Sequence, residues 1–108
     1  MDIAALQRML DSGRDNALLR FSLGKGLLDA GDPQGATSHL LQCVAQDPGY
    51  SAGWKLLGKA WLAAGDAHAA ARAWQQGIEV ARRNGDKQAE KEMTVFKRRA
   101  DKAVAARE

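Results

Sequence analysis

The chain repeats itself at a spacing of 34 residues, and this repeat limits the possible folds more than any other feature of the sequence. When Asn16–Gly49 is laid over Tyr50–Arg83, nine of the 34 aligned pairs are identical. The identities gather in two short blocks, Leu-Gly-Lys and Ala-Gly-Asp, whereas chance matches would scatter. A segment of this length that occurs twice in tandem predicts a duplicated supersecondary unit whose copies bury a shared core.

Each copy has the pattern of two helices joined by a tight turn. In the second copy Trp54, Leu57 and Trp61 recur at steps of three and four residues, which is the spacing of one helical face. Gly65 can end this helix and Asp66 can cap the next one, and the first copy has Gly and Asp at the same places. Period-two alternation is absent, so the sequence predicts an all-α fold without strands.

One further helix is predicted at each end of the chain. Ile3, Leu6 and Leu10 form a short apolar stripe near the N-terminus, and a longer stripe runs through Met93 and Ala100. We expect both helices to cover the open faces of the repeats between them. The 108 residues then form one domain with an N-terminal cap helix at 1–13, repeats at 16–49 and 50–83, and a C-terminal capping helix at 86–106.

The order of large and small residues resembles the tetratricopeptide repeat (TPR), a helix–turn–helix unit of 34 residues. The resemblance is carried by Trp54-x2-Leu57-Gly58-x2-Trp61 with Ala70-x3-Trp74, and by Leu23-Gly24-x2-Leu27 with Ala36-x3-Leu40 and Pro48. It implies a right-handed superhelix of antiparallel helix pairs, here two repeats flanked by an N-terminal and a C-terminal helix. It also implies a protein–protein interaction module that binds a peptide or helix of a partner in a concave groove.

Two positions depart from the pattern. Arg20 stands where the second copy has Trp54, so we expect the first helix to pack less deeply at its start. Arg82 stands where the first copy has Pro48, so nothing stops the second helix of the second copy at that point. We expect that helix to run one turn longer than its counterpart and to shift the register of the helix that follows.

The sequence predicts neither catalysis nor a bound metal or cofactor. His39 and His68 fall in different copies and have no acidic or thiol partner at ligand spacing, and Cys43 is expected to be a buried structural thiol. Because Cys43 is the only cysteine, and because no apolar run reaches about 20 residues, we expect a cytoplasmic protein without a membrane span. We further expect a monomer, with a weak homodimer as the alternative.

The concave groove that the resemblance implies would be lined by the first helix of each repeat. The residues offset from the packing stripes are Phe21, Lys25, Leu28, Lys55, Lys59 and Leu62. Three cations among apolar side chains favour an acidic and apolar partner segment, although the same lysines also suit a merely solvated face.

A second candidate surface is the basic C-terminal helix, because residues 82–108 carry a net charge of +4 and the rest of the chain −1. Its candidate residues are Lys97, Arg98, Arg99 and Lys102. They favour binding of nucleic acid or of an anionic surface, with a solubilising cap as the plainer interpretation. Interleaved acids, and the different directions that adjacent helical residues take, argue against a concentrated patch.

Overall fold

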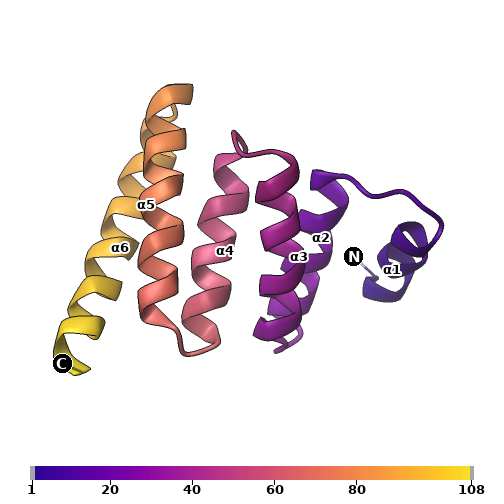
Figure 1. Ribbon diagram of the computed structural model, residues 1–108, viewed down its shortest axis with the longest axis horizontal. Helices are drawn as coiled ribbons and strands as arrows, with labels where there is room; N and C mark the ends of the chain where they lie inside the picture. The colour runs from indigo at the N-terminus through magenta and orange to yellow at the C-terminus, as the bar shows by residue number, and fades with distance from the viewer. Residues whose placement is uncertain (1, 108) are drawn as a thin grey trace.

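The computed structural model describes residues 2–107, which form six helices and no strand. The helices are α1 (Ile3–Asp11), α2 (Ala17–Asp29), α3 (Pro33–Gln46), α4 (Ser51–Ala63), α5 (Ala67–Asn84) and α6 (Lys87–Arg107). They stand side by side in chain order, with α1 and α6 at the two ends of the array (Figure 1). The predicted all-α class is therefore confirmed.

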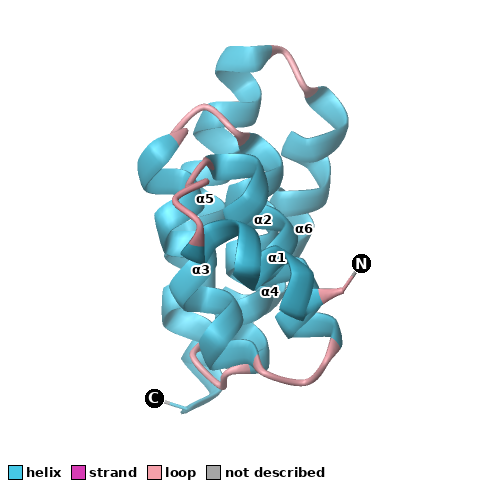
Figure 2. Ribbon diagram, turned by 90° about the vertical axis from the view of Figure 1, so that its right-hand side faces the viewer, coloured by secondary structure: helices cyan, strands magenta, loops and turns pink. Residues whose placement is uncertain are grey.

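The helices lie in two layers. Viewed from the α1 end, α3 and α5 form one layer and α2, α4 and α6 form the other (Figure 2). Between the layers lies an apolar core of three clusters, which includes Leu23, Leu40, Leu57, Trp74 and Met93. The first helix of each repeat, α2 or α4, therefore packs one side against the layer of α3 and α5 and has another side that this layer does not cover.

The turn between the two helices of each repeat has the same construction twice. Asp32 accepts a hydrogen bond from the backbone N–H of Gly35, and Asp66 accepts one from Ala69, both at 2.9 Å. Gly31 and Gly65, one residue earlier, have φ angles of 86° and 88°. Residues with a Cβ rarely adopt these angles, so the Gly-Asp pair fixes where one helix ends and the next begins.

Glycines bring the paired helices into close contact. A Cβ on Gly58 would collide with the indole of Trp74, and a Cβ on Gly24 would collide with the side chain of Leu40. The Trp74 Nε1 donates a hydrogen bond to the carbonyl oxygen of Lys55 at 3.0 Å, so the buried indole has its polar partner. The repeat pattern thus reflects packing of a large side chain against a bare helix backbone.

The second helix of the second repeat is one turn longer than its counterpart, as predicted. α5 has 18 residues and α3 has 14, and α5 ends at the left-handed Gly85, whose φ is 72°. Chain reversal after α5 therefore takes place about one turn farther along the helix axis than it does after α3.

This extra turn shifts the register of α6. Gly53 lies against Cys43, whereas Gly77, the repeat equivalent of Cys43, lies against Met93. Met93 therefore occupies on α6 the position that Gly53 occupies on α4. The two residues are about 40 positions apart in the sequence, whereas equivalent residues of the two repeats are 34 apart. α6 occupies the position of the first helix of a third repeat, displaced by about six residues.

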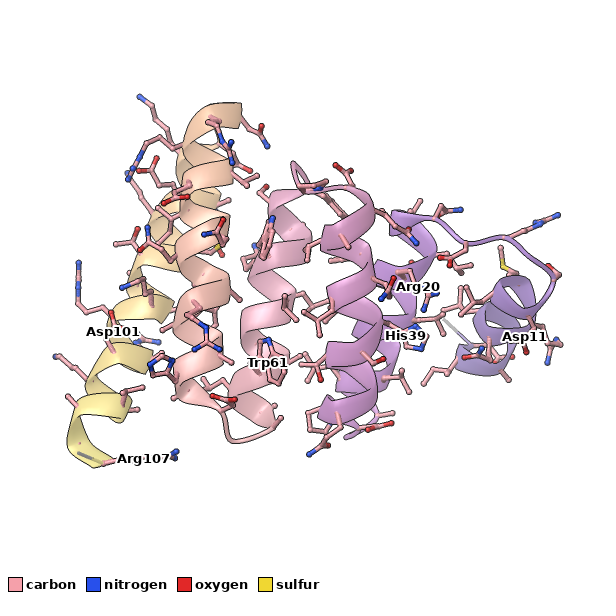
Figure 3. All side chains as sticks on the ribbon, in the orientation of Figure 1. Asp11, Arg20, His39, Trp61, Asp101 and Arg107 are labelled. Atoms are coloured by element: carbon pink, nitrogen blue, oxygen red, sulfur yellow. The ribbon has the colours of Figure 1, made fainter. Side chains whose placement is uncertain are left out.

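The three tryptophans differ in burial. Trp74 is 2% exposed and belongs to the core, as predicted. Trp54 and Trp61 are only half-buried, and both line a shallow hollow of about 230 Å³ together with Leu41. Trp61 lies on α4, on the side that faces the viewer in Figure 3.

We predict that Gly58→Ala destabilises the fold. The added methyl group must displace the Trp74 indole, which costs about 1–3 kcal/mol as overpacking and outweighs a helix-propensity gain of about 1 kcal/mol. Urea unfolding should show a net loss of up to about 2 kcal/mol in the free energy of unfolding. Gln75→Ala, at an exposed position of α5, is the control and should change that free energy by less than about 0.5 kcal/mol. An unchanged midpoint for Gly58→Ala would show that the helices do not depend on this contact.

Candidate functional site

All six predicted groove residues lie on α2 and α4, on the side that turns away from α3 and α5. Lys25 and Lys59 are exposed, and Leu62 is 45% exposed. The others are half-buried, and the Phe21 ring packs against Tyr50 with ring centroids 5.2 Å apart. We call these six residues, Phe21, Lys25, Leu28, Lys55, Lys59 and Leu62, the groove face.

Each lysine of the groove face has a partner within the molecule. Lys25 pairs with Asp29 at 3.2 Å, one turn further along α2. Lys55 pairs with Glu92 of α6 at 3.6 Å. Lys59 lies over the ring of Phe96, with its Nζ 5.2 Å from the centroid. Exposed ion pairs contribute about 0–1 kcal/mol, so an incoming carboxylate can compete for these cations.

α6 extends the groove face beyond the residues predicted. By the 40-residue correspondence, Arg99 takes the place that Lys59 has on α4 and Lys25 has on α2. Val95, 39% exposed, takes the place of Lys55 in the same way. The 34-residue alignment misses this third row, because the longer α5 displaces α6.

The four residues of the predicted basic patch do not share one face. Lys97 forms an ion pair with Asp101 at 2.7 Å. Both line a hollow of about 330 Å³ between α5 and α6, beside His68 and Arg72. Arg98, Arg99 and Lys102 are exposed at other angles around the helix. The structure therefore separates Lys97 and Arg99 from Arg98 and Lys102 around the helix.

A polar cluster that the sequence analysis missed joins the α1–α2 loop to α2 and α3. Arg20 donates two hydrogen bonds to Asp15, each at 2.8 Å, and a third to Nδ1 of His39 at 3.2 Å. Gln46 donates to the same Asp15 carboxylate at 2.8 Å. Figure 3 shows Arg20 and His39 side by side between α2 and α3. Arg20 thus replaces the Trp54 of the second repeat with a hydrogen-bonded contact.

The cluster also shifts two ionisation equilibria. The Arg20 guanidinium, and then the Gln46 amide, hold the pKa of Asp15 well below its usual range. Burial, and then the charge of Arg20, lower the pKa of His39. Both shifts oppose proton uptake by the folded chain. The cluster therefore contributes most to the stability of the fold in neutral solution.

Cys43 is a buried thiol, as predicted. Its exposed fraction is 0%, and burial, followed by the charge of Asp47, raises its pKa to about 11. Among residues 2–107, no group of His, Cys, Asp and Glu side chains is arranged to hold a metal ion, and no helix is long and apolar enough to cross a membrane.

Comparison with known proteins agrees with this helical architecture. A family model described as tetratricopeptide repeat matches residues 1–96, so the chain belongs to the tetratricopeptide repeat family. It is 64% identical over 103 residues to the TPR repeat-containing protein PA0015 of Pseudomonas aeruginosa, covering 95% of this chain and 98% of that one. As a member of this family the chain is a protein–protein interaction module.

Two solved structures show the same fold. The solution structure of protein BPP2914 from Bordetella parapertussis matches with a TM-score of 0.82 and 40% identity, covering 98% of this chain and 92% of that one. The solution structure of a tetratricopeptide repeat domain protein from Salinibacter ruber matches with a TM-score of 0.73 and 27% identity, covering 80% and 87%. The predicted family and fold class are confirmed.

We predict that Asp15 stabilises the fold in a pH-dependent way. Because its pKa is lower in the folded chain than the ordinary value of 3.8, its contribution is fully present above that value and is lost as the pH falls further. The difference in unfolding free energy between the wild type and Asp15→Asn should therefore be constant near neutrality and shrink below about pH 4. Asp11→Asn, at the end of α1, controls for the loss of one carboxylate. A difference that grows as the solution becomes more acidic would contradict the role assigned to Arg20.

We predict that the thiol of Cys43 is protected by the fold. A buried thiol with a pKa of about 11 holds little thiolate at pH 8, so labelling with an aromatic disulfide reagent should be slow in buffer. Labelling should become fast in denaturing guanidinium chloride, where burial no longer applies. Fast labelling of the folded chain would show that the packing of α3 against α4 opens readily.

Proposed function

We propose that the groove face, extended by Val95 and Arg99 of α6, binds a short segment of a partner protein. The segment carries carboxylates flanked by apolar side chains. One observation carries this proposal: Lys25 and Lys59, equivalent residues of the two repeats, are both exposed, on helices α2 and α4 that also carry partly exposed apolar side chains. The two adjacent repeats thus each present an exposed lysine at the same repeat position.

The charges of the groove face support an acidic partner. Lys59 forms an ion pair with no carboxylate among residues 2–107, since its contact is the Phe96 ring. Lys25 is held only by an exposed pair with Asp29, which a partner carboxylate can replace at little cost. Arg99 adds a planar guanidinium that can bind a carboxylate through two hydrogen bonds.

The apolar side chains of the same face support a partner with hydrophobic anchors. Leu62 is 45% exposed, and Leu18, a further residue of α2 outside the six, is 67% exposed. Beside them α2 borders a hollow of about 210 Å³, lined by Phe21, Ser22, Lys25, Gly26 and Asp29. The hollow can accept one apolar side chain while Lys25 meets a neighbouring carboxylate.

We assign the module a scaffold role without catalysis and place it in the cytoplasm as a monomer. Its only cysteine is buried, which suits a reducing compartment. The titratable side chain of His39 is held by Arg20 and is not directed into a cleft.

We predict that Lys25→Glu combined with Lys59→Glu abolishes partner capture. Reversing both charges should lower the retention of a bound partner by at least about tenfold, equivalent to about 1.4 kcal/mol, because repulsion replaces attraction at both repeats. The measurement is affinity capture from extract of the native cells, using equal amounts of immobilised wild type and variant. Circular dichroism checks that helicity and melting temperature are unchanged.

The matched control is Arg8→Glu combined with Arg14→Glu, which makes the same change of charge at the α1 end of the array. This control should retain the partner as the wild type does. Hydrogen exchange should show slower exchange in α2 and α4 when the partner is bound. Retention of the same partner by the Lys25/Lys59 variant would show that binding takes place on another surface.

A further inference from the structure

A separate line of cations runs along the outer side of α6, at the opposite end of the array from α1 (Figure 1). Its four members are all exposed: Lys87, Lys91, Arg98 and Lys102. Steps of four, seven and four residues keep them on one side of the helix over about 22 Å, at a rise of 1.5 Å per residue. The buried Ala89, Met93 and Ala100 lie on the opposite side. We call these four residues the cationic strip.

The acidic residues between these cations are engaged elsewhere. Glu90 pairs with Arg82 at 3.1 Å, and Glu92 pairs with Lys55 at 3.6 Å. Asp101 pairs with Lys97 at 2.7 Å. Within the described part of the chain no carboxylate forms an ion pair with a member of the cationic strip, although Glu90 lies beside Lys87, Lys91 and Arg98. The interleaved acids, which argued against a basic patch in the sequence, instead leave the outer side of α6 positively charged.

The cationic strip lacks the features of a protein-binding or membrane-binding surface. A hollow of about 480 Å³ lies along it, lined by Lys87, Glu90, Lys91, Thr94, Val95 and Arg98. Val95 is the one large apolar side chain in this lining, whereas the centres of protein interfaces are apolar and poor in lysine. Membrane-surface helices likewise need an exposed apolar face, and that of α6 is buried in the array.

The aromatic content of the cationic strip favours double-stranded over single-stranded nucleic acid. Single-stranded nucleic acids bind through aromatic side chains on which bases stack. The aromatic residue of α6, Phe96, packs against Trp74 with ring centroids 5.4 Å apart and lies under Lys59. It is therefore not available on the outer side. A straight row of exposed cations without aromatic or apolar anchors matches the phosphates of a duplex.

We propose that the cationic strip binds the phosphate backbone of duplex DNA without reading base sequence. Lysine and arginine contacts to phosphates supply affinity and position, whereas specificity needs contacts to base edges. This binding goes beyond the groove face, since it uses other cations of α6 and a different class of partner.

The test is the salt dependence of binding to a fluorescein-labelled DNA duplex of roughly 20 base pairs, measured by fluorescence anisotropy. Four phosphate contacts predict a slope of about −3.6 in log affinity against log salt concentration. Raising the salt from about 20 mM to about 100 mM should then weaken binding about 300-fold. Lys91→Gln combined with Arg98→Gln removes two contacts, so the slope should fall to about −1.8.

The matched control is Arg8→Gln combined with Arg14→Gln, which removes the same charge at the α1 end and should leave the slope unchanged. No binding at about 20 mM salt, or equal slopes for the two double variants, would overturn the proposal. So would tighter binding of polyglutamate or of vesicles containing anionic lipid than of DNA. Loss of DNA binding in Lys25→Gln with Lys59→Gln, with the Lys91/Arg98 variant unaffected, would move the site to the groove face. The capture experiment on the groove face contains no DNA step, so the two proposals can fail separately.

Discussion

The contact of Trp74 with the bare backbone at Gly58 is the interaction on which the rest of the structure depends. It sets the distance between α4 and α5, and Leu40 against Gly24 does the same for α2 and α3. The contact also links the core to the groove face, because the carbonyl oxygen that accepts the Trp74 hydrogen bond belongs to Lys55. Because one side of α2 and of α4 packs against its partner helix, the lysines of α2 and α4 lie on the remaining, uncovered side.

The second constraint is the length of α5. Its four additional residues carry the chain past the point where the first repeat turns, so α6 enters the array displaced by about six residues. In this register Glu92 reaches Lys55 and Phe96 reaches Lys59. The closing helix therefore contacts two lysines of the groove face as well as covering the core, although it shows no 34-residue match to the repeats.

Patterns local in the sequence predicted most of the fold. The Gly-Asp turns, the repeat length, the longer α5 and the burial of Cys43 all follow from short-range spacing, and the structure has them. The sequence could not predict the partners of Arg20, because Asp15 and His39 lie on a loop and on another helix whose distance from Arg20 is set by tertiary packing. The contacts of Lys55 and Lys59 were hidden for the same reason, since their partners Glu92 and Phe96 lie on α6 and the contacts depend on its register.

The excess positive charge of the C-terminal helix is divided between two of its sides. Arg98 and Arg99 are neighbours in sequence, but successive residues of a helix point about 100° apart. Arg99 thus continues the row of Lys25 and Lys59, whereas Arg98 belongs to the cationic strip. Internal ion pairs engage Glu90, Glu92 and Asp101, so the charge on both sides is left to act outwards. The two proposed ligands therefore meet different cations of one helix, which is packed on α5 through Met93.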